Sequence, residues 1–352
     1  MLKVNKNKVF VIHDFDGRTY YRALEVENKL IYLNSRPFRF FFRDIIKHRT
    51  LKIDTLKSLF YFFTIPFRSG DNVILAMAPY NFRFIFYSYL CRKNKVVYHT
   101  SWPYWQEVTP FYYSEKLNSI LKLIWVGGLT KFYKKIAVTT AAQKSLSTFL
   151  DQGEVEQIYH VVDCQQIPKE ILSKKWNESF NIGFLGRICP EKGVDLFIQL
   201  SNSFISKEIN YWIAGSGSSI KDVEKESSSR NDFDYIGFLN ERSKVSDFLR
   251  GLNFLILPSL KSDKWEELFG LVIIEAMSQG VIVITTDHVG PCEIINSGID
   301  GFVISEILFV ETAVNIINND QNKYSFEYIA SNAVLRAADF SLPVICEKWK
   351  IF

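Results

Sequence analysis

Residues Phe180–Gly193 read FNIGFLGRICPEKG, and this stretch decides how the rest of the chain is interpreted. An apolar run typical of a buried parallel strand ends at Gly186 and Arg187, and Lys192 follows where the next helical pattern begins. The planar guanidinium of Arg187 can bind two phosphate oxygens, and the ammonium of Lys192 can place a charge on another. The stretch therefore favours an anion site at a strand end, although Arg and Lys are also common in surface turns.

Short apolar runs rich in Val and Ile alternate with helical patterns on both sides of this stretch. The runs are residues 8–13, 72–78, 95–99, 135–139, 180–185, 210–214, 233–236, 254–257 and 281–285. This alternation predicts right-handed βαβ units and parallel sheets buried on both faces. The pattern weakens at 157–167 and a polar stretch follows to Ser179, so we expect two doubly wound α/β domains with a ligand cleft between them.

Length and composition agree with this organisation. The 352 residues suit two domains, and a hydrophobic content of 47% excludes bulk disorder. No uncharged apolar run approaches the ~20 residues that span a bilayer, and the first residues do not resemble a signal peptide, so we expect neither feature. Five cysteines are scattered singly, which argues against a disulfide framework or a zinc site and fits a reducing cytoplasm.

The net charge of +4 conceals an asymmetry between the two halves of the chain. Residues 1–160 carry 24 Lys and Arg against 12 Asp and Glu, a net charge of +12, and the remaining 18 and 26 give residues 161–352 a net charge of −8. A basic half indicates an anionic partner, which could be nucleic acid, anionic lipid or a phosphorylated substrate. A solvated basic surface without a partner would have the same composition.

Residues Arg36–Arg68, RPFRFFFRDIIKHRTLKIDTLKSLFYFFTIPFR, combine cations with many aromatic side chains. Interleaved Lys, Arg, Phe, Leu and Ile are typical of a helix that lies at a membrane surface. The alternative is a helix–loop–helix whose aromatic residues are ordinary core, with Lys and Arg reaching outward. Because the charge excess and the aromatic density coincide in this segment, we expect contact with an anionic membrane surface.

A glycine turn and a pair of carboxylates follow downstream. Gly215 ends an apolar run in YWIAGSGSS, where glycine lets the backbone approach a ligand, although a lone GxG is more often a tight turn. In EELFGLVIIEAMSQG, Glu267 and Glu275 are eight residues apart, and between them Gly270 opens a helix whose first N–H groups can bind an anion. Glu275 follows a wholly apolar run, so we expect it to be buried with a partner rather than solvated.

Taken in order, the motifs resemble the donor-binding half of the retaining GT-B glycosyltransferases of family 4, the glycosyl transferases group 1. The resemblance rests on GRICPEKG, AGSG, YIGFL, LPS, the E-x7-E of EELFGLVIIE, and GPCEII with GIDGFV, and it covers about a third of the chain, from Phe180 to Val303. It implies a GT-B fold of two Rossmann-like domains facing across a cleft. The implied domains are an acceptor-binding domain at 1–160, a donor-binding domain at 161–335 and a terminal helix at 336–352 that crosses back.

The resemblance also implies roles for individual residues and a nucleotide-diphosphate sugar as the donor substrate, with no cofactor and no metal. The residues implied to bind the donor diphosphate are Arg187, Lys192, Gly270, Leu271 and Val272. Those implied to bind the ribose and base are Glu275, Gly215, Phe238 and Leu239. Glu267 would be catalytic, contacting the transferred sugar and facing its reacting carbon.

The first half resembles the family more faintly. His99 ends the run KVVYHT, like the family's histidine that faces the donor sugar, and is the second implied catalytic residue. The family's Gly-Gly loop after the first strand is reduced to Gly17, so Gly17, Asp16 and Trp102 are weaker candidates for acceptor contacts. Trp102 belongs to WPYW, which could stack on an acceptor sugar or form an aromatic lid or interface. Asp14 and Asp16 form a DxD, a metal-chelating motif in GT-A enzymes, but no other GT-A feature accompanies it.

Together these observations predict a retaining glycosyltransferase that moves a sugar from a nucleotide diphosphate to a hydroxyl of a glycan acceptor. The basic half favours a lipid-linked acceptor, so we expect a cytoplasmic enzyme, peripheral on the inner face of the cell membrane, in bacterial surface polysaccharide or lipopolysaccharide synthesis. One alternative is a non-catalytic GT-B scaffold subunit, which has no reason to keep both Glu267 and Glu275. Another is a basic nucleic-acid-binding α/β protein, which does not explain Arg187 and Lys192 together with E-x7-E, so we expect no nucleic-acid partner.

Overall fold

The computed structural model describes residues 7–14, 17–106, 114–162, 174, 176, 179–203, 208–262, 265–319 and 323–350. The chain divides into two compact units, residues 1–161 with 345–352 and residues 162–344. The sequence pattern started the returning terminal segment at 336, whereas residues 336–344 belong to the second unit. The reason is that α13 (Phe326–Ala338) continues past that point and buries Ala337.

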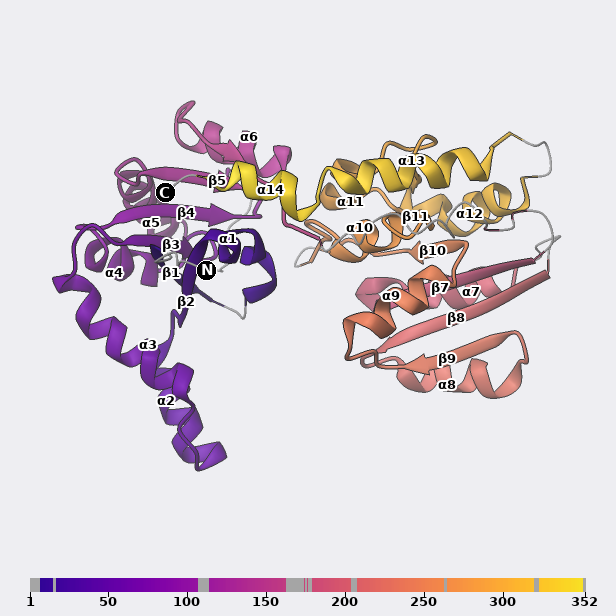
Figure 1. Cartoon of the computed structure of the whole chain (residues 1–352), viewed down its shortest axis with the longest axis horizontal. Helices are drawn as coiled ribbons and strands as arrows, with labels where there is room; N and C mark the ends of the chain where they lie inside the picture. Colours follow the sequence, from indigo (N-terminus) through magenta and orange to yellow (C-terminus); the bar gives the residue numbers. More distant parts are fainter. Residues whose placement is uncertain are drawn as a thin grey trace, which may run out of the picture. The chain divides into compact units, whose positions relative to one another are not determined.

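The first unit contains a six-stranded parallel sheet with the strand order β2-β1-β3-β4-β5-β6 (Figure 1). Its strands are β1 (Asn7–His13), β2 (Asn28–Asn34), β3 (Asn72–Ala76), β4 (Lys95–Thr100), β5 (Lys134–Ala137) and β6 (Glu156–Gln157). The sequence pattern missed β2, in which only Leu33 is buried, and β6, which has two residues. Because the chain leaves β1 for β2 on one side and then returns to β3 on the other, a topological switch point lies between β1 and β3.

Helices of the first unit surround a core rich in aromatic residues. They are η1 (Arg18–Tyr21), α1 (Arg22–Glu27), α2 (Pro37–Arg43), the π-helical turn η2 (Asp44–His48), α3 (Ile53–Thr64), η3 (Ile65–Phe67), α4 (Arg83–Leu90), α5 (Glu115–Leu129), α6 (Thr140–Phe149) and α14 (Leu342–Lys348). Phe84 stacks on Trp125 with 3.8 Å between ring centroids, and Trp105 is fully buried beside them. Trp105 of the WPYW motif is therefore core and not part of an aromatic lid.

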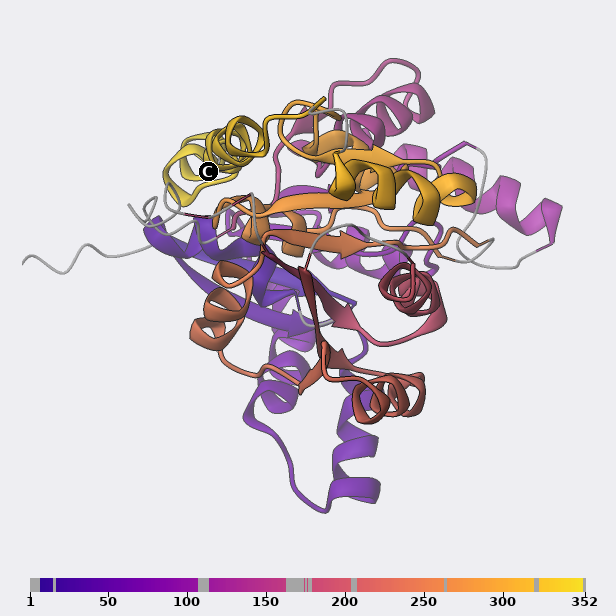
Figure 2. The ribbon, with the colours of Figure 1, turned by 90° about the vertical axis from the view of Figure 1, so that its right-hand side faces the viewer.

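The segment Arg36–Arg68 forms the helices α2 and α3, which extend away from the sheet in both views (Figures 1 and 2). Phe42, Phe60 and Phe63 are each more than half exposed, and Ile46 and Phe67 are exposed to 76% and 86%. For these five side chains, the alternative interpretation as ordinary core is therefore wrong. The side chains form an apolar surface that the described residues of the chain leave open to solvent.

The second unit contains a second six-stranded parallel sheet, with the order β12-β11-β10-β7-β8-β9. Its strands are β7 (Ser179–Arg187), β8 (Glu208–Ser216), β9 (Phe233–Gly237), β10 (Phe254–Leu257), β11 (Ile282–Thr286) and β12 (Phe302–Ile304). The helical elements are η5 (Pro190–Lys192), α7 (Val194–Ser201), α8 (Ile220–Ser229), α9 (Arg242–Arg250), α10 (Leu271–Met277), α11 (Val289–Ile294), η6 (Glu306–Leu308), α12 (Phe309–Asn318) and α13. The three-residue β12 was missed because it is too short for a periodic signal.

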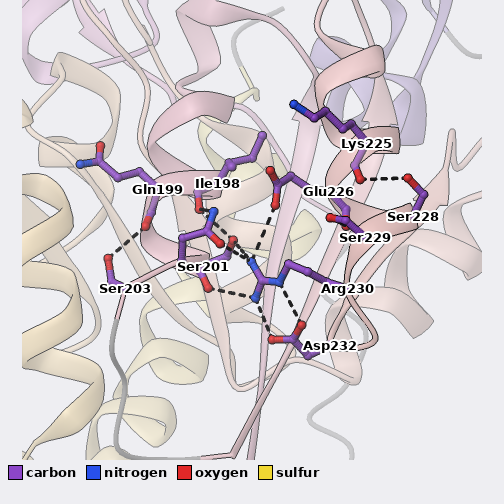
Figure 3. Close-up of polar contacts among 11 residues, drawn as sticks. Ile198, Gln199, Ser201, Ser203, Lys225, Glu226, Ser228, Ser229, Arg230 and Asp232 are labelled. Carbon is purple, nitrogen blue, oxygen red and sulfur yellow. Dashed lines mark hydrogen bonds and ion pairs between the residues drawn. The ribbon is translucent and has the colours of Figure 1, made fainter.

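A polar cluster centred on Arg230 joins three elements of the second unit (Figure 3). Its guanidinium donates to the Asp232 carboxylate at 2.7 and 3.0 Å, and to the hydroxyl and carbonyl oxygens of Ser201 at 2.9 and 3.0 Å. Arg230 follows α8, Asp232 precedes β9 and Ser201 ends α7. The hydrogen bond to Arg230 lowers the pKa of Asp232, and the same pairing raises the pKa of Arg230. The cluster thereby holds both helices against the edge strand.

One helical stretch, Phe326–Lys348, is long and apolar enough to cross a membrane by length and composition alone. This is weak evidence, because helices in the core of a protein domain pass the same test. Six side chains of α13, which forms the first part of the stretch, are buried in the second unit.

Candidate functional site

A cavity of about 350 Å³ lies at the carboxyl ends of β7 and β10 in the second unit. Its walls include Phe184–Arg187 at the end of β7, Leu257 and Ser259 at the end of β10, and Thr285 of β11. β7 and β10 are adjacent in the sheet although β8 and β9 lie between them in the sequence, so the switch point of this sheet lies between β7 and β10. Open parallel sheets bind ligands at such points.

This cavity gathers six of the residues that the sequence predicts to bind or act on the donor. They are Arg187, Lys192, Glu267, Gly270, Val272 and Glu275. They come from the end of β7, from the turn η5 and from the segment that leads into α10. Leu271, also predicted, is half-buried at the first position of α10 and does not line the cavity.

Lys192 and Glu267 form an ion pair between Nζ and Oε2 in this cavity. Their side chains are 20% and 21% exposed, and Nζ also lies 5.0 Å from the ring centroid of Trp265. The aromatic face of Trp265 adds a cation–π attraction to the Lys192 ammonium. Arg187 is exposed at the end of β7 and lines the same cavity.

Gly270 allows the sharp turn from Glu267 into α10. Its φ of 96° lies in the left-handed region, which residues with a Cβ rarely adopt, and an added Cβ would lie 2.8 Å from the Cδ1 atom of Ile273. The turn places the first residues of α10, with the N–H groups that begin a helix, on the cavity wall.

Glu275 lies further along α10 and also lines the cavity. Burial raises the pKa of its carboxyl above 4.5, and the charge of Arg242 acts in the opposite direction. Among the described residues no side chain hydrogen-bonds to this carboxylate. The partner that the sequence pattern led us to expect is therefore not supplied by the described part of the chain.

His288 positions the Glu267 segment, and the sequence analysis missed it. It is 1% exposed, its Nδ1 accepts the backbone N–H of Glu267 at 3.2 Å, and its Nε2 lies 2.9 Å from the carbonyl oxygen of Ser259 and 3.1 Å from the Glu306 carboxylate. These partners are satisfied by the neutral tautomer with its proton on Nε2. The signal was a histidine directly after a strand in TTDHVGPCEII, but a strand-end histidine does not reveal which loop it will meet.

The remaining predicted residues of the second unit do not line this cavity, although Gly215 pairs with the lining residue Gly186 in the sheet. Gly215 ends β8, where its carbonyl oxygen accepts the Tyr235 hydroxyl at 3.1 Å. Phe238 is exposed, and neither it, Gly215 nor Leu239 is a lining residue of the cavity in the described part of the chain.

His99 lies at the end of β4 in the first unit. It is buried, its Nδ1 is 2.8 Å from the Tyr21 hydroxyl, and its Nε2 has no hydrogen-bond partner among the described residues. Burial, followed by the charges of His160 and His13, lowers the pKa of His99 well below 6.5. The imidazole is therefore neutral at pH 7.

The structure places the candidate residues for acceptor contacts in different surroundings. Gly17 lines a first-unit cavity of about 410 Å³ with His13, Asp14 and Arg18. Asp16 lies outside the described residues, and Trp102 is half-buried against the core. Asp14 accepts the backbone N–H of Ala78 at 3.2 Å, the Asn81 amide at 3.0 Å and the Arg83 guanidinium at 2.9 Å, and it also accepts the Ser35 hydroxyl. Asp14 thus anchors the loops after three strands.

Comparison with known proteins agrees with the geometry of the second unit. Residues 168–319, which supply every residue of the switch-point cavity, match the family model Glycosyl transferases group 1. This match covers less than half of the chain, and over these residues the second unit is similar to that family.

Characterised group 1 relatives are similar over part of the chain. The 2-deoxystreptamine N-acetyl-D-glucosaminyltransferase of Niallia circulans is 26% identical over 47% of this chain and 41% of its own length. The capsular polysaccharide biosynthesis glycosyltransferase CapM of Staphylococcus aureus is 30% identical over 56% of this chain and 49% of its own length. This chain therefore spans less than half the length of either relative.

Solved structures show that the fold of this chain is of the GT-B class. The structure of Anabaena Alr3699/HepE in complex with UDP aligns with a TM-score of 0.68 and 15% identity, covering 97% of this chain and 98% of that one. The structure of TarM aligns with a TM-score of 0.58 and 18% identity, covering 83% and 57%. The two parallel six-stranded α/β sheets of this chain match GT-B glycosyltransferase structures, which confirms the fold class predicted from the sequence.

Proposed function

We propose that this chain is a retaining glycosyltransferase that transfers a sugar from a nucleotide-diphosphate donor to a hydroxyl of a lipid-linked glycan. The observation that carries the proposal is the second-unit cavity, where Arg187 and Lys192 line the same space as Glu267 and Glu275. Two cations suit a diphosphate, and two carboxylates suit the hydroxyl groups on either side of it.

The reaction needs stabilisation of negative charge on the departing nucleotide diphosphate. Arg187 and Lys192 would supply fixed positive charge, and the N–H groups at the start of α10 would add hydrogen bonds. The anomeric carbon gains positive character in the transition state, and Glu267 would favour that charge or orient the sugar hydroxyls. Retention would follow from attack on the same face as the leaving group or from a covalent intermediate.

The Lys192–Glu267 ion pair suggests how the cavity accommodates the donor. A diphosphate entering the cavity would compete with Glu267 for the Lys192 ammonium. Lys192 would then bind a phosphate oxygen, and the Glu267 carboxylate would turn to the sugar. Glu275, which has a raised pKa and no side-chain partner among the described residues, would accept hydrogen bonds from the ribose hydroxyl groups.

Names of relatives support a sugar nucleotide and a cell-surface product. HepE was solved with UDP and with UDP-glucose, so UDP-sugars are the first donors to test. CapM acts in capsular polysaccharide biosynthesis, and another relative, 26% identical, is a poly(ribitol-phosphate) alpha-N-acetylglucosaminyltransferase of Staphylococcus aureus. By analogy we place this chain in bacterial surface polysaccharide or lipopolysaccharide synthesis.

The exposed apolar side chains Phe42, Ile46, Phe60, Phe63 and Phe67 form what we call the α2–α3 surface. This surface supports a site of action at the cytoplasmic face of the membrane. Exposed Phe42, Ile46 and Phe67 can enter the headgroup region, and Lys47 and Arg49 lie in the same segment. Cations beside exposed apolar side chains are the combination that binds anionic bilayers peripherally.

The test measures nucleotide release by the full-length chain from a panel of nucleotide-sugars, after a screen for donors that raise its Tm. We expect nucleotide release that depends on one class of donor and continues in the presence of EDTA. Thermal stabilisation without any release, with lipid-linked acceptors supplied, would indicate a scaffold subunit. Salt-sensitive binding to DNA in place of donor binding would indicate a nucleic-acid-binding protein. Inhibition by EDTA that manganese reverses would contradict metal independence.

A further inference from the structure

A second cavity, in the first unit, has a composition that the donor reaction does not explain. It has a volume of about 350 Å³ and lies where α2 and α4 begin. Arg36, Arg39 and Arg83 line it together with Phe38, Phe82 and Phe86. Ser35 on its wall follows β2, and Arg83 follows β3, so the cavity is at the carboxyl edge of the sheet, where α/β proteins bind ligands.

Positive charge in this cavity exceeds the negative charge that faces it. Asp14 is the carboxylate that pairs with Arg83, at 2.9 Å, and no carboxylate among the described residues forms an ion pair with Arg36 or Arg39. The Nε atoms of Arg36 and Arg83 are buried and lack a hydrogen-bond partner in the described part of the chain. Burial lowers the pKa of Arg36; repulsion by Arg83 and Arg39 adds to this, and Asp14 opposes it. The arrangement therefore leaves an excess of positive charge on the cavity wall.

Aromatic side chains on the same walls are open to solvent. Phe38, Phe82 and Phe86 are 43%, 53% and 58% exposed. The exposed surface continues from the cavity along α4 through Ile85 and Tyr89, and along α3 through Phe60 and Phe63. A site for a small inorganic anion does not need aromatic walls, and an ordinary core does not contain three arginines.

We infer that this cavity binds a phosphate or diphosphate attached to a long apolar chain, as found on a polyprenyl-linked acceptor. Arg36, Arg39 and Arg83 contact the phosphate oxygens, and the chain lies across Phe38, Phe82 and Phe86. The inference rests on the proposed function, since it gives the lipid-linked acceptor a place on the first unit. A phospholipid headgroup or free phosphate offers the same anion, so the test must separate the three sources.

The test titrates the full-length chain by calorimetry with farnesyl diphosphate below its micelle concentration. Excess UDP is present throughout, to occupy the donor cavity. Farnesol lacks the anion and inorganic diphosphate lacks the chain, so both should bind at least about tenfold more weakly than farnesyl diphosphate. Arg36→Gln and Arg39→Gln should each weaken farnesyl diphosphate binding about tenfold. Lys225→Gln, which removes an exposed cation from α8 of the second unit and not from the cavity, should leave the affinity unchanged.

Several results would overturn the inference. Equal affinity of inorganic and farnesyl diphosphate would reduce the site to an anion site without a chain. Equal affinity of Arg36→Gln, Arg39→Gln and the parent would remove the cavity from the binding reaction. Binding to phosphatidylglycerol vesicles that farnesyl diphosphate does not displace would assign the arginines to membrane headgroups. Nucleotide release from the donor is measured separately on the parent chain. A failure of farnesyl diphosphate binding can therefore be distinguished from a failure of the proposed glycosyltransferase function.

Discussion

Lys192 and Glu267 are ion-paired to each other in the second-unit cavity, although family resemblance assigns them to different parts of the donor. The lysine is implied to hold the diphosphate and the glutamate to face the sugar. Their pairing means that these two charges satisfy each other within the cavity. Ligand binding must exchange this ion pair for new contacts, so the effects of substituting these two residues should differ in sign.

We predict that Glu267→Gln binds UDP as tightly as the parent or up to about tenfold more tightly, because Lys192 no longer has a competing carboxylate. The same variant should lose kcat, since it lacks the carboxylate that we propose to face the reacting carbon. Lys192→Ala should bind UDP about ten- to a hundredfold more weakly. Calorimetry with UDP and steady-state kinetics provide the measurements.

Lys261→Ala is the control for this comparison, because Lys261 is an exposed lysine paired with Glu266 and does not line the cavity. It should leave UDP affinity unchanged. Weaker UDP binding by Glu267→Gln than by the parent would show that the pair does not compete with the nucleotide.

Glu275→Gln should stabilise the protein at neutral pH while raising the donor KM. Burial raises the pKa of the Glu275 carboxyl. Its favourable contribution to the free energy of unfolding is therefore fully present below pH 4.5 and is lost as pH rises through the folded-state pKa. Replacement by Gln removes the cost of a buried charge at pH 7 and changes little near pH 4. The check compares Tm of variant and parent at both pH values. An equal Tm difference at the two pH values would contradict an origin in ionisation.

Acid should destabilise the first unit through its buried histidines. Burial lowers the pKa of His160 from 6.5 to about 3, and the unfolded chain therefore binds a proton that the folded chain excludes. Stability is unaffected above pH 6.5 and falls by up to about 1.4 kcal/mol per pH unit as pH decreases towards 3. His160→Gln should flatten this dependence in urea unfolding followed from pH 7 to pH 4. The hypothesis fails if parent and variant have parallel profiles.

The α2–α3 surface should bind vesicles that contain anionic lipid, release them at high salt and ignore neutral vesicles. Each cation near the surface contributes about 1 kcal/mol, so Lys47→Gln with Arg49→Gln should weaken binding by roughly one order of magnitude or more. Ile46→Ser should weaken it further by removing an exposed apolar side chain. Co-sedimentation measures each variant.

A charge-matched control replaces Lys225 and Lys244 of the second unit with Gln. This double variant should sediment with vesicles as the parent does. If it loses as much binding as the Lys47 and Arg49 variant, net charge and not the α2–α3 surface governs the interaction.

The amino-acid pattern was sufficient to predict the two parallel sheets, because a buried strand such as β10 is a continuous apolar run with turn residues after it. It also determined the content of the donor cavity. Arg187, Lys192, Glu267 and Glu275 each lie at a fixed short distance from a strand end or a helix start, and parallel strands bring those ends to one edge. Local spacing was sufficient for these features.

Only the tertiary structure decided which side chains pair and which stay exposed. The Lys192–Glu267 ion pair joins segments 75 residues apart, and His288 reaches the Glu267 backbone from the loop after β11. Likewise, Phe42 and Trp105 are both aromatic residues of motifs that the sequence made candidates for contact with a membrane or a sugar. Phe42 is exposed, whereas Trp105 is buried in the core. Burial and pairing depend on which distant segments pack together. The identity of an apolar residue does not reveal whether another segment covers its side chain.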